Sequence, residues 1–161
     1  MSMNTKRDCP CHSGLRYAEC CAPFHDGARE APTPEALMRS RYAAFALGLG
    51  EYLARTLATT HKDLALPHPE LVLQLSRTRE HQRFAGLRIL HTASNEQRGE
   101  VLFFARIYAR GADHSFAELS QFVREGDAWR YTEGQLLEKA KLPADVAALT
   151  RAEFLSLCSA I

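Results

Sequence analysis

The spacing of hydrophobic residues divides the chain into a helical first half and a strand-rich second half. From residue 38 onward, apolar side chains recur every three or four positions, as on one face of an α-helix. This stripe consists of Met38, Tyr42, Phe45 and Leu49. Thr33 precedes it with a side-chain oxygen suited to an N-cap, and Gly48 and Gly50 are placed to stop the helix. The pattern predicts a helix over residues 34–47.

Weaker apolar repeats predict further helices over residues 51–59 and 70–77. After Gln135, a last apolar series predicts one or two terminal helices, with Pro143 opening the second. The members of this series are Leu136, Leu137, Val146, Leu149, Phe154 and Leu157.

Alternating residues predict strands between these helices. In residues 99–110, successive side chains point to opposite faces of a strand. One face carries Val101, Phe103, Ala105 and Ile107, and the other carries Leu102, Phe104, Arg106 and Tyr108. Further strands are expected over residues 83–92, 114–124 and 128–133. Tight turns at 111–113 and 125–127 would join the last three strands into an antiparallel meander.

The order of these elements favours an α+β fold, because helices come first and strands follow them. A parallel α/β fold built from βαβ units would instead alternate helices with strands along the chain. We expect the helices to pack on a curved antiparallel sheet, since both faces of residues 101–108 carry bulky side chains.

Four of the five cysteines of the chain lie within residues 9–21. They form a C-x-C pair and a C-C pair, namely Cys9, Cys11, Cys20 and Cys21. Four thiolates from one short loop match the tetrahedral ligand set of a closed zinc site. Gly14 permits a tight reversal between the pairs, and Ser13 can hydrogen-bond locally. The sequence therefore predicts one structural Zn²⁺ per chain, and metal binding would supply most of the folding free energy of the loop.

Other interpretations of the cysteines compete with this one. Disulfides need an oxidising compartment, but residues 1–8 carry no apolar stretch of a signal peptide, and five cysteines leave one unpaired. A redox pair is more often C-x-x-C, and a catalytic zinc usually keeps an open position. His12 and His25 are candidate substitute ligands, although ordinary loop histidines are the favoured interpretation.

Two stretches of the sequence resemble known families. The loop residues Cys9-Pro10-Cys11, Ser13-Gly14, Tyr17 and Cys20-Cys21 resemble the SEC-C zinc motif, which also occurs at the C-terminal tail of the SecA translocase motor. Residues 36–46 and 118–125 resemble the YchJ-like family of small bacterial proteins. The same resemblance extends to Tyr52, Leu53, Thr56, Trp129 and Tyr131.

The resemblance implies a nuclear-transport-factor-like α+β cone behind the zinc loop, and it implies no reaction. We therefore expect a SEC-C-type zinc-binding loop over residues 1–30 and a cone domain with C-terminal helices over 31–161. Many YchJ-like members end in a second SEC-C motif, of which only Cys158 remains here. The glycine that usually follows the second cysteine is His12, which is tolerable unless the backbone needs a positive φ.

Length and charge indicate a compact soluble protein. A chain of 161 residues suits one domain with an appended loop. No apolar run approaches the roughly 18 residues that span a bilayer, so we expect no membrane insertion and a cytoplasmic location. The formal net charge of +1 indicates no particular partner.

A cone of helices over a bent sheet is expected to leave a pocket at its wide end. The polar candidates for this pocket are Arg41, Tyr42, His61, Asp63, His114, Glu118 and Tyr131. If residues 114–124 form one strand, His114 and Glu118 share a face but lie about 13 Å apart, too far for a tight catalytic dyad. More ordinary roles are a core position for each tyrosine and an ion pair between Arg41 and a carboxylate such as Glu118.

The middle of the chain is rich in arginine. Residues 77–110 contain seven arginines and three glutamates, a net charge of +4. Arginines on one face would attract phosphate or an acidic protein surface, whereas scattered arginines would form a solvated surface of mixed sign. The scattered arrangement is favoured, because the alternation assigns Arg88 and Arg106 to their faces independently.

Two hypotheses for function follow from these features. In the first, the protein is not an enzyme, and the zinc loop docks a protein or another macromolecule while the cone serves as scaffold. In the second, the cone pocket makes the protein a small-molecule enzyme or a ligand carrier. Nucleic-acid binding through the arginine-rich middle is a weaker third hypothesis, and the oligomeric state stays open.

Overall fold

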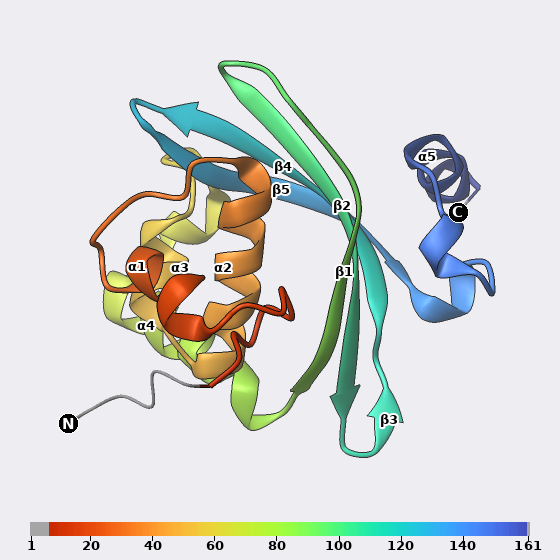
Figure 1. The fold of residues 1–161 in the computed structure, drawn as a ribbon, viewed down its shortest axis with the longest axis horizontal. Coiled ribbons are helices and arrows are strands. Elements are labelled where there is room, and N and C mark those ends of the chain that lie inside the picture. The colour runs from red at the N-terminus through yellow and green to blue at the C-terminus, as the bar shows by residue number, and fades with distance from the viewer. Residues whose placement is uncertain (1–6, 161) are drawn as a thin grey trace.

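The computed structural model describes residues 7–160, which form an antiparallel sheet with helices on both faces (Figure 1). The α-helices are α1 (Ala22–His25), α2 (Pro34–Leu47), α3 (Gly50–Arg55), α4 (His68–Ser76) and α5 (Arg151–Ser159). Short 3-10 helices are η1 (Tyr17–Glu19), η2 (Lys62–Ala65), η3 (Thr78–Glu80), η4 (Lys139–Lys141) and η5 (Val146–Ala148). Helices α1 to α4 cover one face of the sheet, and α5 lies on the other (Figure 1). The expected α+β class is confirmed.

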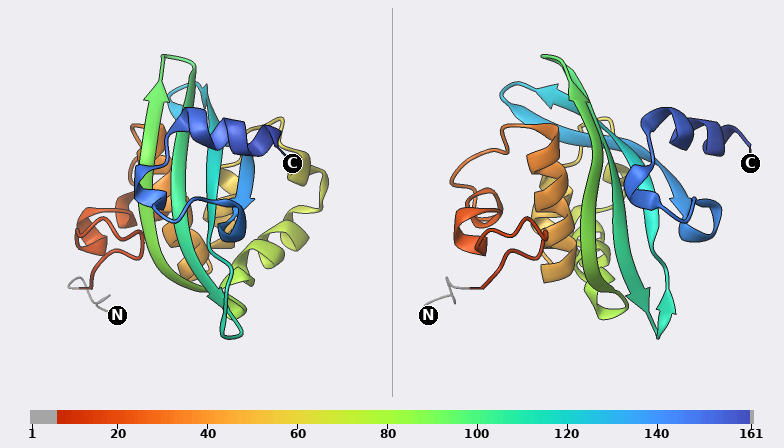
Figure 2. Two further views of the ribbon diagram at one scale, coloured as in Figure 1. Left: turned by 90° about the vertical axis from the view of Figure 1, so that its right-hand side faces the viewer. Right: turned by 45° about the vertical axis from the view of Figure 1, so that its right-hand side comes forward.

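The sheet is a bent meander (Figure 2). Its strands are β1 (Arg83–Ser94), β2 (Arg98–Ala109), β3 (Ala112–Asp113), β4 (Phe116–Glu125) and β5 (Ala128–Glu138). The order across the sheet is β1-β2-β4-β5, β3 pairs with the end of β2, and every pair is antiparallel. Register shifts near Gly86 and Leu90 interrupt β1, which explains why its sequence alternates poorly.

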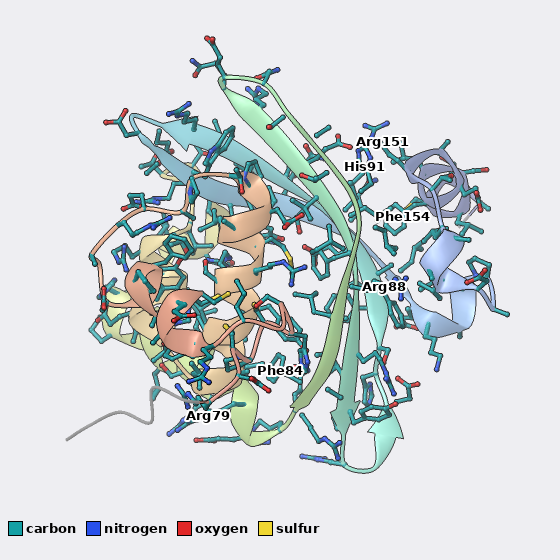
Figure 3. The ribbon with its side chains drawn as sticks, viewed as in Figure 1. Arg79, Phe84, Arg88, His91, Arg151 and Phe154 are labelled. Carbon is teal, nitrogen blue, oxygen red and sulfur yellow. The ribbon has the colours of Figure 1, made fainter. Side chains whose placement is uncertain are left out.

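Strand β2 separates two hydrophobic cores, as its alternation predicts. Toward α2, the core contains Val101, Phe103, Ala105 and Ile107 from this strand. Toward α5, Leu102 packs with Leu119, Leu137, Leu149 and Phe154. Figure 3 shows Phe84 on the α2 side of the sheet and Arg88, His91, Arg151 and Phe154 on the α5 side. Both faces of β2 carry bulky side chains because each face is covered.

Helix α2 begins and ends where the sequence predicts. The Thr33 side chain accepts a hydrogen bond from the Ala36 amide at 3.0 Å, and Pro34 is the first helical residue. Gly48 ends the helix with a left-handed φ of 72°. The stripe of Met38 and Tyr42 is buried against the sheet.

Helix α3 is shorter than the predicted 51–59, because the chain leaves it to pair with the edge of the sheet. The Ala58 amide donates to the Tyr131 carbonyl at 2.8 Å, and the Tyr131 amide donates to the Thr56 carbonyl at 2.9 Å. Gly50 opens α3 rather than ending α2. A Cβ at Gly50 would lie 2.2 Å from both the Val72 carbonyl and the Ser76 hydroxyl, so glycine allows the close contact with α4.

The second half of the sheet also departs from the prediction. His114 lies between β3 and β4 instead of within a strand, because Ser115 turns the chain through bonds to Asp113 and Ile107. Strand β5 continues to Glu138, beyond the expected 133, so Leu137 belongs to the sheet. The prediction that His114 and Glu118 share a strand face is therefore wrong.

The C-terminal region contains one α-helix, and its start is not at Pro143. Thr150 caps α5 by accepting from the Glu153 amide at 3.1 Å. The helix is fixed to the sheet by the buried Phe154 and by Arg151, which pairs with Glu100 in contact with His91. Within residues 7–160, no helix combines the length and apolar character needed to cross a membrane.

The cap of α2 gives a first test of this fold. Thr33→Ala should lower the free energy of unfolding by about 1 kcal/mol, because the Ala36 amide loses its acceptor. Thr60→Ala is the matched control, since Thr60 is exposed. Urea denaturation measures both. Equal stabilities of the two variants would contradict the cap.

Candidate metal centre and cavity

A tight backbone turn brings the two cysteine pairs together. The Cys9 amide donates to the Leu15 carbonyl at 2.8 Å, and Gly14 between them has a φ of 86°, which suits glycine. The Ser13 hydroxyl accepts from the Leu15 amide at 3.2 Å and also contacts the Cys20 sulfur at 3.2 Å. The roles predicted for Gly14 and Ser13 are confirmed.

The four sulfur atoms of this turn form one cluster. The Sγ atoms of Cys9, Cys11, Cys20 and Cys21 all lie within 4.8 Å of one another. The Cys11 to Cys20 distance is 3.6 Å, and the Cys20 to Cys21 distance is 3.9 Å. Cys20 is partly exposed, and the other three are buried. The cluster can therefore hold one metal ion with four sulfur ligands.

The thiols alone cannot all ionise at this separation. Hydrogen bonding with Cys11 raises the pKa of both Cys9 and Cys21, and burial adds to both shifts. Hydrogen bonds from Cys21 and Cys9 lower the pKa of Cys11. A divalent cation resolves this conflict, because metal-bound thiols are deprotonated and the cation neutralises their charge. The donor set thus fits a thiophilic metal.

His25 is not a substitute ligand, because both of its ring nitrogens are engaged elsewhere. Its Nε2 donates to the Ser40 carbonyl at 2.7 Å, and its Nδ1 then accepts from the Tyr17 hydroxyl at 2.7 Å. Burial lowers the pKa of His25, which favours this neutral form. His25 therefore connects Tyr17 of the cysteine-containing loop to Ser40 of α2.

His12 is also directed away from the sulfur atoms. Its φ of 60° shows that this position does need the left-handed backbone that glycine adopts most easily. The ring makes two contacts: Nε2 donates to the Phe84 carbonyl at 3.3 Å, and the ring packs edge-on against Tyr42 at 5.8 Å. His12 thus connects the loop to the wall of the cavity described below.

The cysteine knuckle, residues 9–21, packs directly on α2. Its buried residues Cys9, Cys11, Tyr17 and Cys21 share one apolar cluster with Ala43 of the helix. The Arg39 guanidinium donates to the Cys11 carbonyl at 3.1 Å. The knuckle is therefore a supporting layer behind α2 rather than a free appendage.

On its opposite side, α2 covers a cavity of about 330 Å³ against the sheet, and this cavity is partly open to solvent. The walls are mainly apolar and come from α2 and four strands. Among them are Met38, Phe45, Phe103, Ile107, Phe116 and Phe122. Polar groups enter from Arg41, Glu118, Ser120 and Tyr131. This volume falls at the lower end of the range for small-molecule sites, about 300–1,000 Å³.

Arg41 is the buried cation of this cavity, only 8% exposed. Its Nη1 donates to the Leu53 carbonyl at 2.7 Å and to the Thr56 hydroxyl at 2.6 Å, both at the end of α3. Its guanidinium carbon lies 4.9 Å from the Tyr131 ring centroid. Desolvation lowers the pKa of Arg41 to about 10, so the side chain remains charged at neutral pH.

Glu118 supplies the carboxyl group. Its Oε2 accepts from the Ser120 hydroxyl and, at 3.3 Å, from the Tyr131 hydroxyl. Burial raises the pKa of Glu118, opposed by these hydrogen bonds and by the charge of Arg41. A Cβ at Gly134 would lie 2.5 Å from Oε2, so this glycine makes the room for the carboxyl group. The ion pair expected between Arg41 and Glu118 does not form within 4.0 Å.

The other candidate pocket residues occupy different places. Tyr42 lines the cavity and donates to the Gly86 carbonyl at 2.9 Å. His114 is exposed and does not line the cavity. His61 and Asp63 also lie outside the lining, where the His61 ring accepts from the Asp63 amide. Sequence reasoning missed Ser120 and Gly134, which carry no distinctive spacing.

Two of the arginines from the middle of the chain share a face after all. Arg88 and Arg106 both line a surface groove on the α5 side of the sheet, together with His12 and Asp145. Arg106 also donates to the Tyr108 hydroxyl at 3.3 Å. The groove thus mixes positive and negative side chains.

Family models match the two parts of the chain. The model of the YchJ middle NTF2-like domain matches residues 33–134, and that of the SEC-C motif matches residues 8–23. With the fold and the sulfur cluster, these matches define an NTF2-like protein that carries a cysteine motif able to bind metal.

Curated relatives identify the family. A UPF0225 protein of Deinococcus radiodurans is 43% identical over 126 residues, which cover 78% of this chain and 86% of that protein. The UPF0225 protein YchJ of Shigella dysenteriae is 34% identical over 128 residues, covering 78% and 81%. The chain belongs to the YchJ-like family.

Solved structures share the fold. The solution structure of a SEC-C motif containing protein from Rhodopseudomonas palustris matches with a TM-score of 0.69 and 37% identity, covering 80% of this chain and 98% of that one. A crystal structure of a SEC-C motif containing protein from Psychrobacter arcticus matches with a TM-score of 0.65 over 97% of both chains. At 24% identity, the second match shows the fold alone.

The sulfur cluster predicts a specific metal dependence. Cys9→Ser should lose the stoichiometric metal and melt at a lower temperature, because one of four ligands is removed and α2 loses its support. Cys158→Ser should keep both properties, since Cys158 lies in α5. Elemental analysis and thermal melts measure them. Equal metal content in the two variants would contradict the site.

The buried carboxyl group predicts a pH-dependent stability. Burial raises the pKa of Glu118 in the folded protein, so the folded state favours the protonated carboxyl group. The free energy of unfolding is therefore highest below the pKa of the unfolded chain, and it falls as the pH rises through the native pKa and the buried group ionises. Glu118→Gln should therefore become more stable than wild type toward about pH 9, and this advantage should disappear near about pH 4.

Urea unfolding across this pH range tests the expectation, with the exposed Glu138→Gln as control. A Glu118→Gln variant that loses stability relative to wild type as the pH rises would show instead that an ionised Glu118 stabilises the fold.

Proposed function

We propose that this protein is a non-enzymatic small-molecule binding protein or carrier, in which a structural zinc site supports the wall of the binding cavity. The observation that carries the proposal is the apolar cavity under α2, in which Arg41 and Glu118 present polar groups to one space. An apolar site with a few convergent polar groups is typical of ligand binding.

Zinc is the metal that fits the sulfur cluster best. A tetrahedral Zn²⁺ with bonds of about 2.3 Å to sulfur has edges of about 3.8 Å between its ligands. Two separations in the cluster are close to that edge, 3.6 Å between the sulfur atoms of Cys11 and Cys20 and 3.9 Å between those of Cys20 and Cys21. Four sulfur ligands leave no position for a substrate, which favours a structural over a catalytic role.

The arrangement of polar groups supports binding more than catalysis. Glu118 and Tyr131 hydrogen-bond to each other, and Arg41 is attached to the end of α3. His114, a candidate pocket residue, lies outside the cavity lining. The Ser120 hydroxyl is a candidate nucleophile among the lining residues, but no histidine of the described chain lines the cavity to activate it, so the remaining groups are better suited to orienting a ligand.

Docking of a macromolecule by the zinc loop stays a second proposal. Its support is the tip of the knuckle, where Leu15 is 53% exposed. Against it, the rest of the loop is packed on α2, so little of its apolar surface is left for a partner. Single exposed apolar side chains are also common on protein surfaces.

Nuclear magnetic resonance with the neutral probe 2-phenylethanol tests the proposed cavity site. Shifts should saturate and be confined to the residues that line the cavity, which come from α2, β1, β2, β4 and β5 and include Thr78 and Gln82. Thr78→Trp should abolish them because a bulky ring replaces a small lining side chain, whereas Thr60→Trp at an exposed position should not. Scattered, unsaturable shifts in wild type would contradict the proposal.

A further inference from the structure

The cavity contains a buried positive charge that forms no ion pair with any of residues 7–160. Among residues 7–160, the groups that accept from Arg41 are the Leu53 carbonyl and the Thr56 hydroxyl, both uncharged and both bound to Nη1. A buried guanidinium without a counter-charge is costly, so proteins usually pair it. Arg41 lines the cavity, and its Nε and Nη2 atoms make no hydrogen bond within the described chain.

Arg41 is held in a fixed position for such a partner. Its two bonds to α3 and the stacking on Tyr131 restrain the guanidinium plane. A restrained guanidinium loses little side-chain entropy when it binds an anion, and its paired N–H groups match the two oxygens of a carboxylate.

Glu118 does not fill this role. The Oε2 atom of Glu118 already accepts hydrogen bonds from Ser120 and Tyr131. The Glu118 carboxyl group lies beyond ion-pair distance from the Arg41 guanidinium. Its raised pKa reduces the negative charge that would oppose an anionic ligand. Protonated, Glu118 can donate a hydrogen bond to the same ligand.

The walls of the cavity indicate the size and the apolar character of the part of the ligand that does not contact Arg41. Met38, Phe45, Phe103, Ile107 and Phe122 surround the cavity with apolar atoms. A dry cavity of about 150 Å³ holds a benzene ring, so twice that volume suits a molecule of roughly ten to fourteen non-hydrogen atoms.

We propose, on the basis of the cavity function above, that the natural ligand is a small monocarboxylate with an aromatic or branched apolar body, bound through its carboxylate to Arg41. Phosphate esters fit less well, because a dianion would meet one cation and the carboxyl group of Glu118 in a largely apolar space.

Three probes of similar size and different charge test this inference. Phenylacetate, phenylacetamide and 2-phenylethylammonium are titrated into the wild-type protein at neutral pH, with affinities from chemical shifts. Phenylacetate should bind at least about tenfold more tightly than the amide, because its charge-assisted bonds form in an apolar site. The cation should bind most weakly.

Variants assign the preference to Arg41. Arg41→Met should lose the advantage of phenylacetate and retain the binding of phenylacetamide, whereas the exposed Arg77→Met should change neither. Glu118→Gln should bind phenylacetate at least as tightly as wild type, because it removes an opposing charge. If Arg41→Met fails to fold, the carboxylate inference is tested by the other two proteins. Wild type must prefer phenylacetate to phenylacetamide, and Glu118→Gln must keep that preference.

Each alternative outcome has a distinct meaning. Equal affinity for the three probes, or a preference for the cation, would overturn the carboxylate inference while leaving a ligand-binding cavity. Saturable binding of 2-phenylethanol without any binding of phenylacetate would do the same. Absence of binding by every probe, including 2-phenylethanol, would overturn both proposals.

Discussion

The packing of α2 between two layers is the constraint on which the rest of the structure depends. One side of the helix contacts the cysteine knuckle through Ala43 and Arg39, and the other closes a cavity against the sheet. The knuckle is short and has few apolar groups of its own, so a metal held by its four sulfur atoms would be its main source of rigidity. Metal binding and the shape of the cavity would then be linked through one helix, and through the His12 ring against Tyr42.

This arrangement explains why polar groups can remain inside the cone. Arg41 reaches across from α2 to the end of α3, and residues 56–58 then join the edge of β5. The same strand provides Tyr131, which stacks on Arg41 and hydrogen-bonds to Glu118. A buried cation and a buried carboxyl group are thus fixed by backbone elements on three sides. The Nη1 atom of Arg41 has a structural role, because it bonds to the end of α3. The Nε and Nη2 donors remain in the cavity, and they are the basis for the proposed ligand.

The sequence predicted the elements whose signals are local. Periodicity and the Thr33 cap located α2, and alternation assigned both faces of β2. The prediction fails where distant contacts decide the structure. Helix α3 ends early because residues 56–58 pair with Tyr131, and β5 extends beyond the expected residue 133 because its partner strand β4 continues to pair with it. Of the predicted pocket residues, Arg41, Tyr42 and Glu118 line the cavity, whereas His114 does not. The bond pattern around Ser115, which displaces His114, has no local signature in the sequence.

X-ray absorption at the zinc edge of protein purified without added metal or chelator tests the central claim most directly. The account predicts one zinc per chain with four sulfur neighbours at about 2.3 Å and no lighter ligand. The same spectrum from Cys158→Ser should be unchanged. A first shell containing nitrogen or oxygen at about 2.0 Å would show an open or differently ligated site, and protein free of zinc would contradict the metal-supported knuckle behind α2.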